Sequence, residues 1–588
     1  MCGIVGYVGD KECNKILYDG LKMLEYRGYD SVGIATVDKG GFNIIKKKGR
    51  VATIEQDCLT LKGTVGIGHT RWATHGNPSD NNSHPHISQH FAVVHNGIIE
   101  NYLDLKIGLV NRGVHFNSQT DTEVIVHTIE KNYTGNFLQA VTKSLKELIG
   151  SFAIAVMCKD YPNEIIVAKK DNPVLIGEKD GEYFIASDIP AIAEHTDNIY
   201  YLEDEEISII EKNKISFFSF DGHKIIKNSK KIDIEKNQLG MSGYESYMLK
   251  EIHEIPSSVR KTAQSLKELQ LPKECLDAFK NSDFIKIIGC GTAYNSGLVG
   301  KTLFEDQAKV RCDTEIASEF RYSNTLINNK TLVIAVSQSG ETADTLAGVK
   351  LAKMLGAYVL LITNVPNSTI TNYADYSIVT KAGQEIAVAA TKSYCCQLVT
   401  FYYLAEQVAL SRGIKVDLIS KMDSLAEKIE SVFSLDEQLI DLAQRYHTVQ
   451  SVFFLGRILD YSVAVEASLK LKEISYIHSE GYAGGELKHG TLALIDENVL
   501  VVSLETQDKL LLKMENAVKE VEARGANIVI VTQYDSAHKD VVKLPVAEDI
   551  FMPLIEIVPL QLFAYYVSRC RGQDADKPRN LAKSVTVE

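Results

Sequence analysis

The sequence predicts an α+β first half followed by an α/β second half that is built from two copies of one unit. Three observations support this fold class. Strand-like apolar runs dominate the chain up to about residue 220, strands alternate with long helical stretches after about residue 245, and distant segments of the second half resemble each other. Apolar strands that alternate with helices are typical of a parallel sheet covered on both faces.

Length and composition indicate a globular protein of several domains. A chain of 588 residues is too long for one core, so we expect about three or four packing units. No run approaches the ~18 apolar residues of a membrane span, and the first residues lack the pattern of a signal peptide. We therefore expect a cytoplasmic protein without a membrane partner. The net charge of −13 argues against nucleic acid as a partner.

The first half contains six strand-like runs and two helical stretches. The predicted strands are 3–9, 31–38, 42–49, 91–97, 151–158 and 164–170, and the predicted helices cover about 11–25 and 122–148. A polar, Lys-rich stretch at 221–245 then marks the expected domain boundary. A surface hairpin inside one domain is the alternative interpretation of that stretch.

The second half carries an internal repeat. Strands are predicted at 284–291, 331–337 and 357–363, each followed by a helical period. Residues 333–363 resemble 500–532, and 284–297 resemble 452–465. The repeat predicts two similar α/β units.

A loop rich in hydroxyl groups, Ser337-Gln338-Ser339-Gly340-Glu341-Thr342, follows a strand of the first copy. A helix N-terminus at the carboxyl end of a parallel strand binds anions well, and the loop lacks the lysine of a nucleotide-binding P-loop. It therefore predicts a monoester phosphate site, with an ordinary helix cap as the alternative. The second copy has Ser503-Leu504-Glu505-Thr506 instead, so we expect only the first copy to bind an anion.

Three charged residues, Glu466, Lys470 and Glu473, share one face of a predicted helix with apolar flanks. A solvated stripe is the common case for such spacing, but the apolar flanks favour the floor of a polar pocket. A carboxylate beside an ammonium can move protons between adjacent carbons. His489 is a further candidate acid or base. The sequence around Lys583, in the terminal tail, indicates a solvated lysine.

The cysteine at position 2 becomes the first residue if Met1 is removed. Its α-amine can then act as the base for its own thiol, as in N-terminal nucleophile hydrolases. Asn96 and Gly97 are candidates for an oxyanion hole, Arg71 for a carboxylate clamp and Asp121 for a partner of a substrate ammonium. A cysteine without a role is the alternative.

Metal and disulfide frameworks are not expected. The ten cysteines include no C-x-x-C pair. His84, His86 and His90 could suggest a metal, but no cysteine or acidic cluster accompanies them, and Pro85 predicts a loop there.

Together, the motifs resemble one known family over the whole chain. MCGIVGYVG, LEYRGYDSVGIA, HTRWATHG, HNGIIEN, TDTEV, SQSGETADT, LKLKEISYIH, GELKHG and PRNLAKSVTVE occur in the order and spacing of the glutamine–fructose-6-phosphate aminotransferase (isomerising) family. The resemblance implies transfer of ammonia from glutamine to fructose 6-phosphate, with isomerisation to glucosamine 6-phosphate. It implies no metal or organic cofactor, and a homodimer.

The resemblance also implies a fold and its boundaries. It implies a class II glutaminase of the N-terminal-nucleophile type, an αββα sandwich, followed by two doubly wound parallel-sheet SIS (sugar isomerase) subdomains. The implied segments are 2–236 for the glutaminase domain, 237–246 for a linker, 247–412 and 413–570 for the SIS subdomains, and 571–588 for a tail over the active site.

The family's functional residues are carried over onto matching positions. Cys2 matches the nucleophile, Glu473 the base that moves a proton between C1 and C2, and Lys583 the lysine that forms a Schiff base with the ketose. Further matches are Asn96 and Gly97 for the oxyanion hole; Arg27, Arg71, Thr74, His75, Gly97 and Asp121 for glutamine; Thr292, Ser337, Gln338, Ser339, Thr342, Val388 and Ala582 for the sugar phosphate; Glu466 and Lys470 beside the base; His489 for ring opening; and Trp72 for the gate of an ammonia channel.

Two departures concern the sugar pocket. Ala293 and Ala390 stand where the family usually has Ser, which removes two hydroxyl contacts, and Thr491 replaces a usual Pro. A related enzyme on another phosphosugar is therefore the nearest alternative. Amidophosphoribosyl transfer would need a diphosphate-ribose loop that we do not find, and a non-catalytic sugar-phosphate sensor would lack the catalytic groups that are present here.

Overall fold

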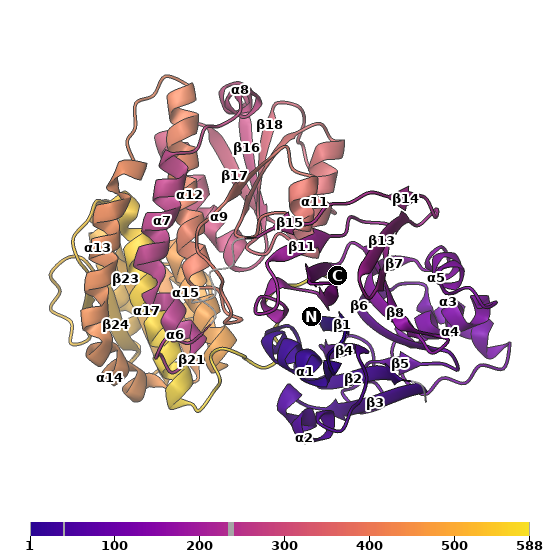
Figure 1. Ribbon diagram of the computed structural model, residues 1–588. Coiled ribbons are helices and arrows are strands. Elements are labelled where there is room, and N and C mark those ends of the chain that lie inside the picture. Colours follow the sequence, from indigo (N-terminus) through magenta and orange to yellow (C-terminus); the bar gives the residue numbers. More distant parts are fainter. Residues whose placement is uncertain (1, 39–40, 233–239, 587–588) are drawn as a thin grey trace. The chain divides into compact units, whose positions relative to one another are not determined.

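The computed structural model describes residues 2–38, 41–232 and 240–586, which fall into two compact units (Figure 1). The first unit comprises residues 1–239 and 584–588, and the second comprises 240–583. Met1, residues 237–239 of the predicted linker and the last two residues of the predicted tail lie outside the described residues. The domain boundaries that the resemblance implies stay a prediction.

The described part of the first unit contains two antiparallel sheets. In the eight-stranded sheet the order is β15-β11-β9-β10-β1-β4-β2-β3, and in the seven-stranded sheet it is β14-β13-β12-β8-β7-β6-β5. The strands of the first sheet are β1 (Gly3–Val8), β2 (Ser31–Asp38), β3 (Gly41–Lys48), β4 (Val65–Arg71), β9 (Leu175–Lys179), β10 (Glu182–Ala186), β11 (Asn198–Tyr201) and β15 (Lys230–Lys231). Those of the second are β5 (His86–Ile87), β6 (Phe91–Ile99), β7 (Gly150–Cys158), β8 (Tyr161–Lys170), β12 (Glu206–Glu211), β13 (Lys214–Ser219) and β14 (Lys224–Ile225).

Both faces of these sheets are buried, because alternate residues of a strand point to opposite sides. On β1, Ile4 packs between the two sheets while Val5 packs under a helix, and on β6 the same holds for Val94 and Val93. The helices that cover the outer faces are α1 (Cys13–Met23), α2 (Glu55–Cys58), α3 (Tyr102–Val110), α4 (Glu123–Asn132) and α5 (Phe137–Leu145). The layers are helix, sheet, sheet, helix, which confirms the predicted αββα sandwich.

One predicted helix is divided. The stretch 122–148 forms α4 and α5 rather than one helix, because Gly135 adopts a φ of +94° between them. Asn136 then caps α5, its side chain accepting a hydrogen bond from the Gln139 amide at 2.9 Å.

The described part of the second unit contains two five-stranded parallel sheets with the same strand order, β17-β16-β18-β19-β20 and β22-β21-β23-β24-β25. The first consists of β16 (Phe284–Gly289), β17 (Arg311–Ile316), β18 (Thr331–Val336), β19 (Tyr358–Thr363) and β20 (Tyr376–Val379). The second consists of β21 (Ser451–Gly456), β22 (His478–Ala483), β23 (Val499–Glu505), β24 (Asn527–Thr532) and β25 (Val541–Lys543). This is the doubly wound order 2-1-3-4-5, so the predicted repeat of two such subdomains is confirmed.

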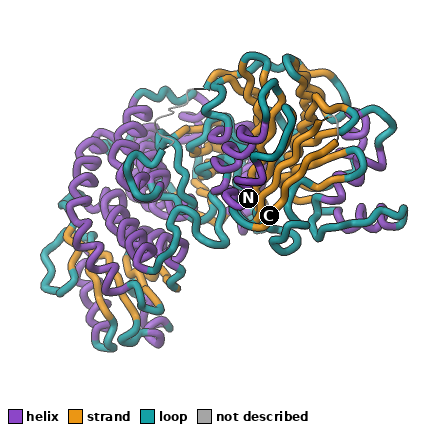
Figure 2. Tube along the Cα trace, turned by 60° about the horizontal axis from the view of Figure 1, so that its bottom comes forward, coloured by secondary structure: helices purple, strands orange, loops and turns teal. Residues whose placement is uncertain are grey.

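Helices flank both parallel sheets, as Figure 2 shows by colour. They are α6 (Tyr247–His253), α7 (Ile255–Lys267), α8 (Lys273–Asn281), α9 (Thr292–Gln307), α10 (Ala317–Phe320), α11 (Ala343–Met354), α12 (Lys392–Ser411), α13 (Met422–Val432), α14 (Asp436–Tyr446), α15 (Leu459–Ser475), α16 (Leu511–Glu522) and α17 (Met552–Cys570).

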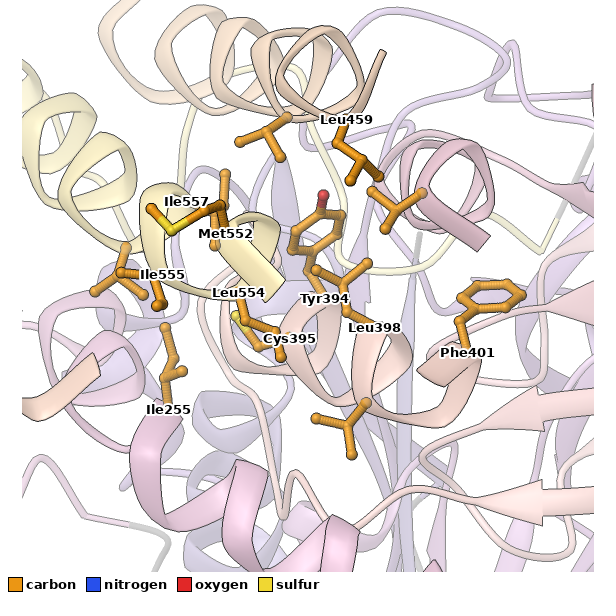
Figure 3. Packing of buried hydrophobic residues seen from close by; sticks show 14 of the residues in the cluster. Ile255, Tyr394, Cys395, Leu398, Phe401, Leu459, Met552, Leu554, Ile555 and Ile557 are labelled. Carbon is orange, nitrogen blue, oxygen red and sulfur yellow. The ribbon is translucent and has the colours of Figure 1, made fainter. Parts of the chain in front are cut away.

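One hydrophobic core joins the two parallel-sheet subdomains. It includes Tyr394 and Leu398 of α12 together with Leu554 and Ile557 of α17 (Figure 3). The segment 549–570, which includes α17, is long and apolar enough to cross a membrane, so the expectation that no run approaches that length is wrong. However, 89% of its apolar window is buried inside the protein. Helix α17 is therefore a core helix.

Candidate functional site

The thiol of Cys2 lies at the start of β1, against the backbone of Trp72. The Trp72 amide donates a hydrogen bond to Sγ at 3.2 Å, and Sγ lies 3.6 Å from the Trp72 carbonyl oxygen. Burial raises the pKa of the Cys2 thiol, while the Trp72 amide and the Arg71 guanidinium oppose that rise. A thiol whose pKa is raised needs a base before it can act as a nucleophile.

Asn96 and Gly97 lie beside Cys2 at the end of β6. Asn96 Nδ2 donates to the Cys2 carbonyl oxygen at 3.1 Å. Gly97 has a φ of +133°, and a Cβ there would lie 2.0 Å from the Ser151 carbonyl oxygen, so no other residue fits. A side-chain amide and a tight backbone turn next to the thiol are the components of an oxyanion hole.

A column of buried imidazoles orients Asn96. His69 Nε2 donates to Asn96 Oδ1 at 3.1 Å and to the His95 carbonyl oxygen at 2.9 Å, which fixes the position of the Asn96 amide group. The His69 ring stacks on His84, and His84 meets His86 edge to face. Burial lowers the pKa of His69 to about 3 and holds those of His84 and His86 well below the usual range, so these rings are neutral.

The three histidines that the sequence could assign to a metal have other contacts in the structure. His84 and His86 belong to the buried column, and His90 bonds to Glu130 with Nδ1 to Oε1 at 2.6 Å. Among the residues that the structure describes, no group of three His, Cys, Asp or Glu side chains could hold a metal ion.

Two buried charged residues flank the thiol. Arg71 NH2 donates to the carbonyl oxygens of His75 and Gly76, the latter at 3.0 Å, while NH1 is buried without a partner. Asp121 Oδ2 accepts from the Ile99 amide at 2.9 Å. The unpartnered guanidinium nitrogen and the Asp121 carboxylate are suited to the carboxylate and the ammonium of an amino acid.

The remaining predicted glutamine residues surround this group. Arg27 Nε donates to the Cys2 carbonyl oxygen at 3.4 Å, and Arg27 NH1 pairs with Asp188 at 2.9 Å. Thr74 is exposed, and its hydroxyl lies 3.4 Å from His75 Nδ1. The Trp72 ring is half-buried and packs edge to face on Tyr29.

In the second unit, the hydroxyl-rich loop lies at the carboxyl ends of the parallel strands, between β18 and α11. Ser337 Oγ and Thr342 Oγ1 are 2.9 Å apart, and the Gly340 amide donates to Ser337 Oγ at 3.0 Å. Gly340 has a φ of +65°, and its missing Cβ would lie 1.9 Å from Ser368 Oγ. The hydroxyls and the first amides of α11 therefore converge at the switch point between β16 and β18, where a doubly wound sheet binds its ligand.

The matching point of the second sheet is occupied by carboxylates instead. Ser503 Oγ donates to Glu505 at 2.9 Å, and Thr506 Oγ1 donates to Asp460 at 2.5 Å. Burial raises the pKa of both acids to about 7. Because these acids take the hydroxyl donors, the second copy is unsuited to a phosphate.

A buried group of charged side chains lies on α15. Lys470 Nζ is 2.6 Å from Glu473, 3.5 Å from Glu466 and 3.1 Å from Thr292 Oγ1, to which it donates. Asn295 Nδ2 donates to Glu466 at 2.8 Å. Burial raises the pKa of Glu466 to about 7, and although burial works against the Lys470 ammonium, the two glutamates raise its pKa. The three side chains are largely buried, so they do not form a solvated stripe, and Thr292 links them to the first sheet.

The terminal tail is anchored in the second unit. Lys583 Nζ pairs with Glu385 at 2.5 Å, and both side chains are buried, at 6% and 0% exposure. The Val388 amide donates to the Asp576 carbonyl oxygen at 3.0 Å, and Ala582 is half-buried. The interpretation of Lys583 as a solvated lysine is wrong, because a buried carboxylate binds it.

His489 is exposed in a short 3-10 helix (Glu486–His489). In the described chain, no hydrogen bond or ion pair joins it to Glu466, Lys470 or Glu473. The structure thus brings together most of the predicted residues of each unit, but His489 stands apart from its group.

Three residues of these sites were missed by sequence reasoning: His69, Asn295 and Glu385. The signal for Glu385 was available, since it is the one acid in the small apolar segment EIAVAAT. His69 and Asn295 act through contacts with residues far away in sequence, for which the sequence holds no periodic signal.

Domain profiles match both halves of the chain. A glutamine amidotransferase domain profile matches residues 69–194, and an SIS domain profile matches residues 278–407 and again 446–568.

Curated relatives match over their whole length. The chain is 48% identical over 615 residues to a protein of Caldanaerobacter subterraneus subsp. tengcongensis and 46% identical over 611 residues to one of Clostridium tetani, with all of each chain covered. Both relatives are named glutamine–fructose-6-phosphate aminotransferase (isomerizing). A solved C-terminal domain of glucosamine-fructose-6-phosphate aminotransferase from Francisella tularensis is 36% identical, with a TM-score of 0.55, and covers 58% of this chain and 100% of that domain.

Proposed function

The chain belongs to the glutamine–fructose-6-phosphate aminotransferase (isomerizing) family, and we propose that Cys2 and Lys583 are the two covalent centres of its reaction. The protein transfers the amide nitrogen of glutamine to fructose 6-phosphate and isomerises the product to glucosamine 6-phosphate. The nitrogen is released in one half of the chain and used in the other.

One observation carries the assignment of the sugar chemistry. A buried Glu466–Lys470–Glu473 group contacts Thr292, which begins the helix after the first strand of a parallel sheet whose switch point is lined with hydroxyls and helix amides. A phosphate cradle in one subdomain, linked through Thr292 to a proton-transfer group on the other, supplies what an aldose–ketose isomerisation of a phosphosugar requires.

In the glutamine half, the Cys2 thiol attacks the amide carbonyl of glutamine. Its own α-amine, freed by removal of Met1, takes the thiol proton, and Asn96 with the Gly97 amide binds the oxyanion. Ammonia leaves, and water then hydrolyses the thioester to glutamate. Arg71 and Asp121 hold the substrate's carboxylate and ammonium, with Arg27, Thr74 and His75 nearby.

In the sugar half, Ser337, Gln338, Ser339 and Thr342 bind the phosphate, and Val388 and Ala582 contact the sugar. Lys583 forms an imine at C2, which ammonia then displaces. Glu473 moves a proton from C1 to C2, supported by Lys470, and His489 opens the sugar ring. Trp72 gates the passage of ammonia. The proposal includes a homodimer in the cytoplasm.

The test replaces the proposed nucleophile. Cys2→Ala removes the thiol, so glutamine-dependent synthesis of glucosamine 6-phosphate is expected to fall to background, while sugar isomerisation continues at the wild-type rate. Synthesis is measured by quantifying glucosamine 6-phosphate, and isomerisation by quantifying glucose 6-phosphate formed from fructose 6-phosphate.

The control is Cys58→Ala, which removes a buried thiol of the same unit that lies outside the site. Glutamine-supported synthesis that survives in Cys2→Ala contradicts the nucleophile assignment. Mass spectrometry of the mature N-terminus checks the base, since retained Met1 leaves Cys2 without a free α-amine.

A further inference from the structure

The lysine proposed to form the imine is bound by a carboxylate that no functional role yet accounts for. Glu385 Oε2 lies 2.5 Å from Lys583 Nζ, and the Glu385 side chain is fully buried. A lysine on a terminal segment ordinarily extends into water. Burying both partners of an ion pair costs free energy of desolvation, so the position of this lysine needs an explanation.

The Glu385 carboxylate is fixed in place from three further directions. Oε1 accepts from the amides of Thr391 at 3.0 Å and Ser393 at 3.1 Å, and Oε2 accepts from Ser393 Oγ at 2.8 Å. These donors belong to the N-terminal turn of α12, one of the most deeply buried helices of the second unit. The carboxylate therefore has a fixed position, and the ion pair with it fixes the position of the Lys583 ammonium.

Glu385 carries the negative charge at this point. Burial opposes ionisation, but Lys583 and the α12 amides outweigh it and hold the pKa of Glu385 at about 2. The neighbouring acid is Glu251 of α6, whose Oε1 accepts from the amides of Ile386 and Ala387. Burial and the charge of Glu385 raise the pKa of Glu251 to about 8, so Glu251 is mainly neutral at pH 7.

The other charged or titratable groups around Glu385 have partners of their own. Lys392 of α12 pairs with Glu254 at 2.7 Å, and Lys470 of α15 pairs with Glu473. Burial raises the pKa values of the Cys395 and Cys396 thiols, which are therefore neutral. Lys583 is thus the cation that pairs with Glu385.

The segment that Glu385 begins also carries the predicted sugar contacts. Val388 lies three residues later and Ala390 five residues later. The Val388 amide bonds to Asp576 of the tail, so the segment and the tail that bears Lys583 are joined at two points.

We infer that Glu385 is the positioning residue and counter-ion of Lys583 in imine formation. The inference rests on the proposed function of Lys583. The Lys583 ammonium first gives up one proton, and the free amine attacks C2 to form a neutral carbinolamine. The C2 oxygen then takes up a proton and leaves as water, and a protonated imine remains. The nitrogen is positively charged before and after the step, so one fixed carboxylate stabilises both charged forms.

The experiment traps the imine on the full-length protein. Fructose 6-phosphate and sodium borohydride are added, and mass spectrometry of the digested protein quantifies the reduced adduct on Lys583 over time. In Glu385→Gln the trapping rate is expected to fall about 100-fold, as for loss of a preorganised charge contact.

Conservative replacement separates positioning from a structural role. Glu385→Asp keeps the charge and is expected to restore trapping to within about tenfold of the wild type. The matched control is Glu406→Gln, a buried α12 glutamate that accepts from the Leu418 and Ile419 amides, which is expected to trap at the wild-type rate. Glutamine hydrolysis at Cys2 is expected to stay at the wild-type rate in all three variants.

The outcomes are distinguishable. An unchanged trapping rate in Glu385→Gln overturns the inference, as does an equal loss in Glu385→Gln and Glu385→Asp. If the wild type gives no adduct on Lys583, the proposed role of the lysine itself is wrong. If Glu385→Gln does not fold, Ser393→Ala decides: it removes one donor that fixes Glu385, and an unchanged trapping rate in that variant also overturns the inference.

Discussion

At the scale of single residues, two alanines decide how tightly the sugar is expected to bind. Ala293 is buried at the start of α9, and Ala390 is half-buried in the segment that Glu385 begins. The family usually has Ser at both positions. A hydroxyl that reaches a sugar oxygen contributes about 0.5–1.5 kcal/mol, so its absence weakens binding rather than abolishing it.

Restoring the hydroxyl at the more accessible position is the corresponding test. Ala390→Ser is expected to lower KM for fructose 6-phosphate about two- to tenfold with little change in kcat, since a ground-state contact is added. KM for glutamine serves as the internal control and should not move. An unchanged or higher KM for fructose 6-phosphate would mean that position 390 does not face the sugar, and a panel of other phosphosugars would then be assayed.

The environment of single residues could be predicted where several charged residues occur in one short motif. The burial of Glu466, Lys470 and Glu473 contradicts a solvated stripe, in agreement with their apolar flanks, and the pocket floor stays a prediction. Glu385 and His69 were not predictable, because each acts on a functional group through a contact that spans many residues of sequence. The residue types alone, one acid and one histidine, are more often structural.

At the scale of elements, a contact at the end of α15 joins this helix to the terminal tail. Tyr476 follows the last residue of the helix with a φ of +61°, an unfavourable conformation for a large side chain. Its hydroxyl accepts from the Arg579 amide at 2.7 Å, and the Arg579 guanidinium lies 4.2 Å from its ring centroid. These two contacts form a clamp between Tyr476 and the tail, at a residue whose backbone conformation is itself unfavourable.

Tyr476→Phe removes the hydroxyl and keeps the ring. Loss of this hydrogen bond is expected to weaken the binding of the tail by about 1 kcal/mol. The fraction of protein with Lys583 in place then falls, and borohydride trapping on Lys583 falls about fivefold. Glutamine hydrolysis should be unaffected. Tyr482→Phe is the matched control, because that tyrosine lies in the same subdomain but is not part of the clamp. Equal trapping in Tyr476→Phe and the wild type would show that the clamp does not govern Lys583.

Most elements could be predicted, because their hydrophobic period is strong. The run 31–38 is a strand with the predicted bounds, whereas the helix predicted over 122–148 is divided by Gly135. A single glycine is tolerated within a helix at a cost of about 1 kcal/mol, so sequence alone does not decide whether it interrupts one. The local conformation of Tyr476 had no sequence signal, since φ above zero is ordinarily a property of Gly and Asn.

At the scale of the whole molecule, the repeat was the most informative feature of the sequence. It predicted two parallel sheets, and the loss of hydroxyls in the second copy predicted a single phosphate loop. The structure adds the reason: Glu505 and Asp460 take the hydroxyl donors at the second switch point. The closure of two antiparallel sheets over one core was implied by resemblance only, because strand pairing between distant segments leaves no local pattern.

The buried histidines make the stability of the first unit depend on pH. Because the folded pKa of His69 is about 3 and the unfolded value is about 6.5, the unfolded chain binds more protons between these pH values. The stabilisation is therefore complete above about pH 6.5 and is lost as the pH falls. At pH 5, each such histidine removes about 2 kcal/mol of stability, and His84 and His86 have pKa values shifted in the same direction.

Unfolding of the first unit can be followed separately, because Trp72 is the chain's only tryptophan and lies in that unit. Its fluorescence midpoint in urea is expected to fall steeply between pH 7 and pH 5. The glutamine in His84→Gln does not titrate and keeps an acceptor for the His95 amide. The variant should therefore lose about 2 kcal/mol less unfolding free energy between pH 7 and pH 5 than the wild type. The exposed His223→Gln is the control and should follow the wild type. A midpoint that is equal at pH 7 and pH 5 would mean that the column is hydrated and titrates normally, and the fixed orientation of Asn96 by a neutral His69 would then have to be abandoned.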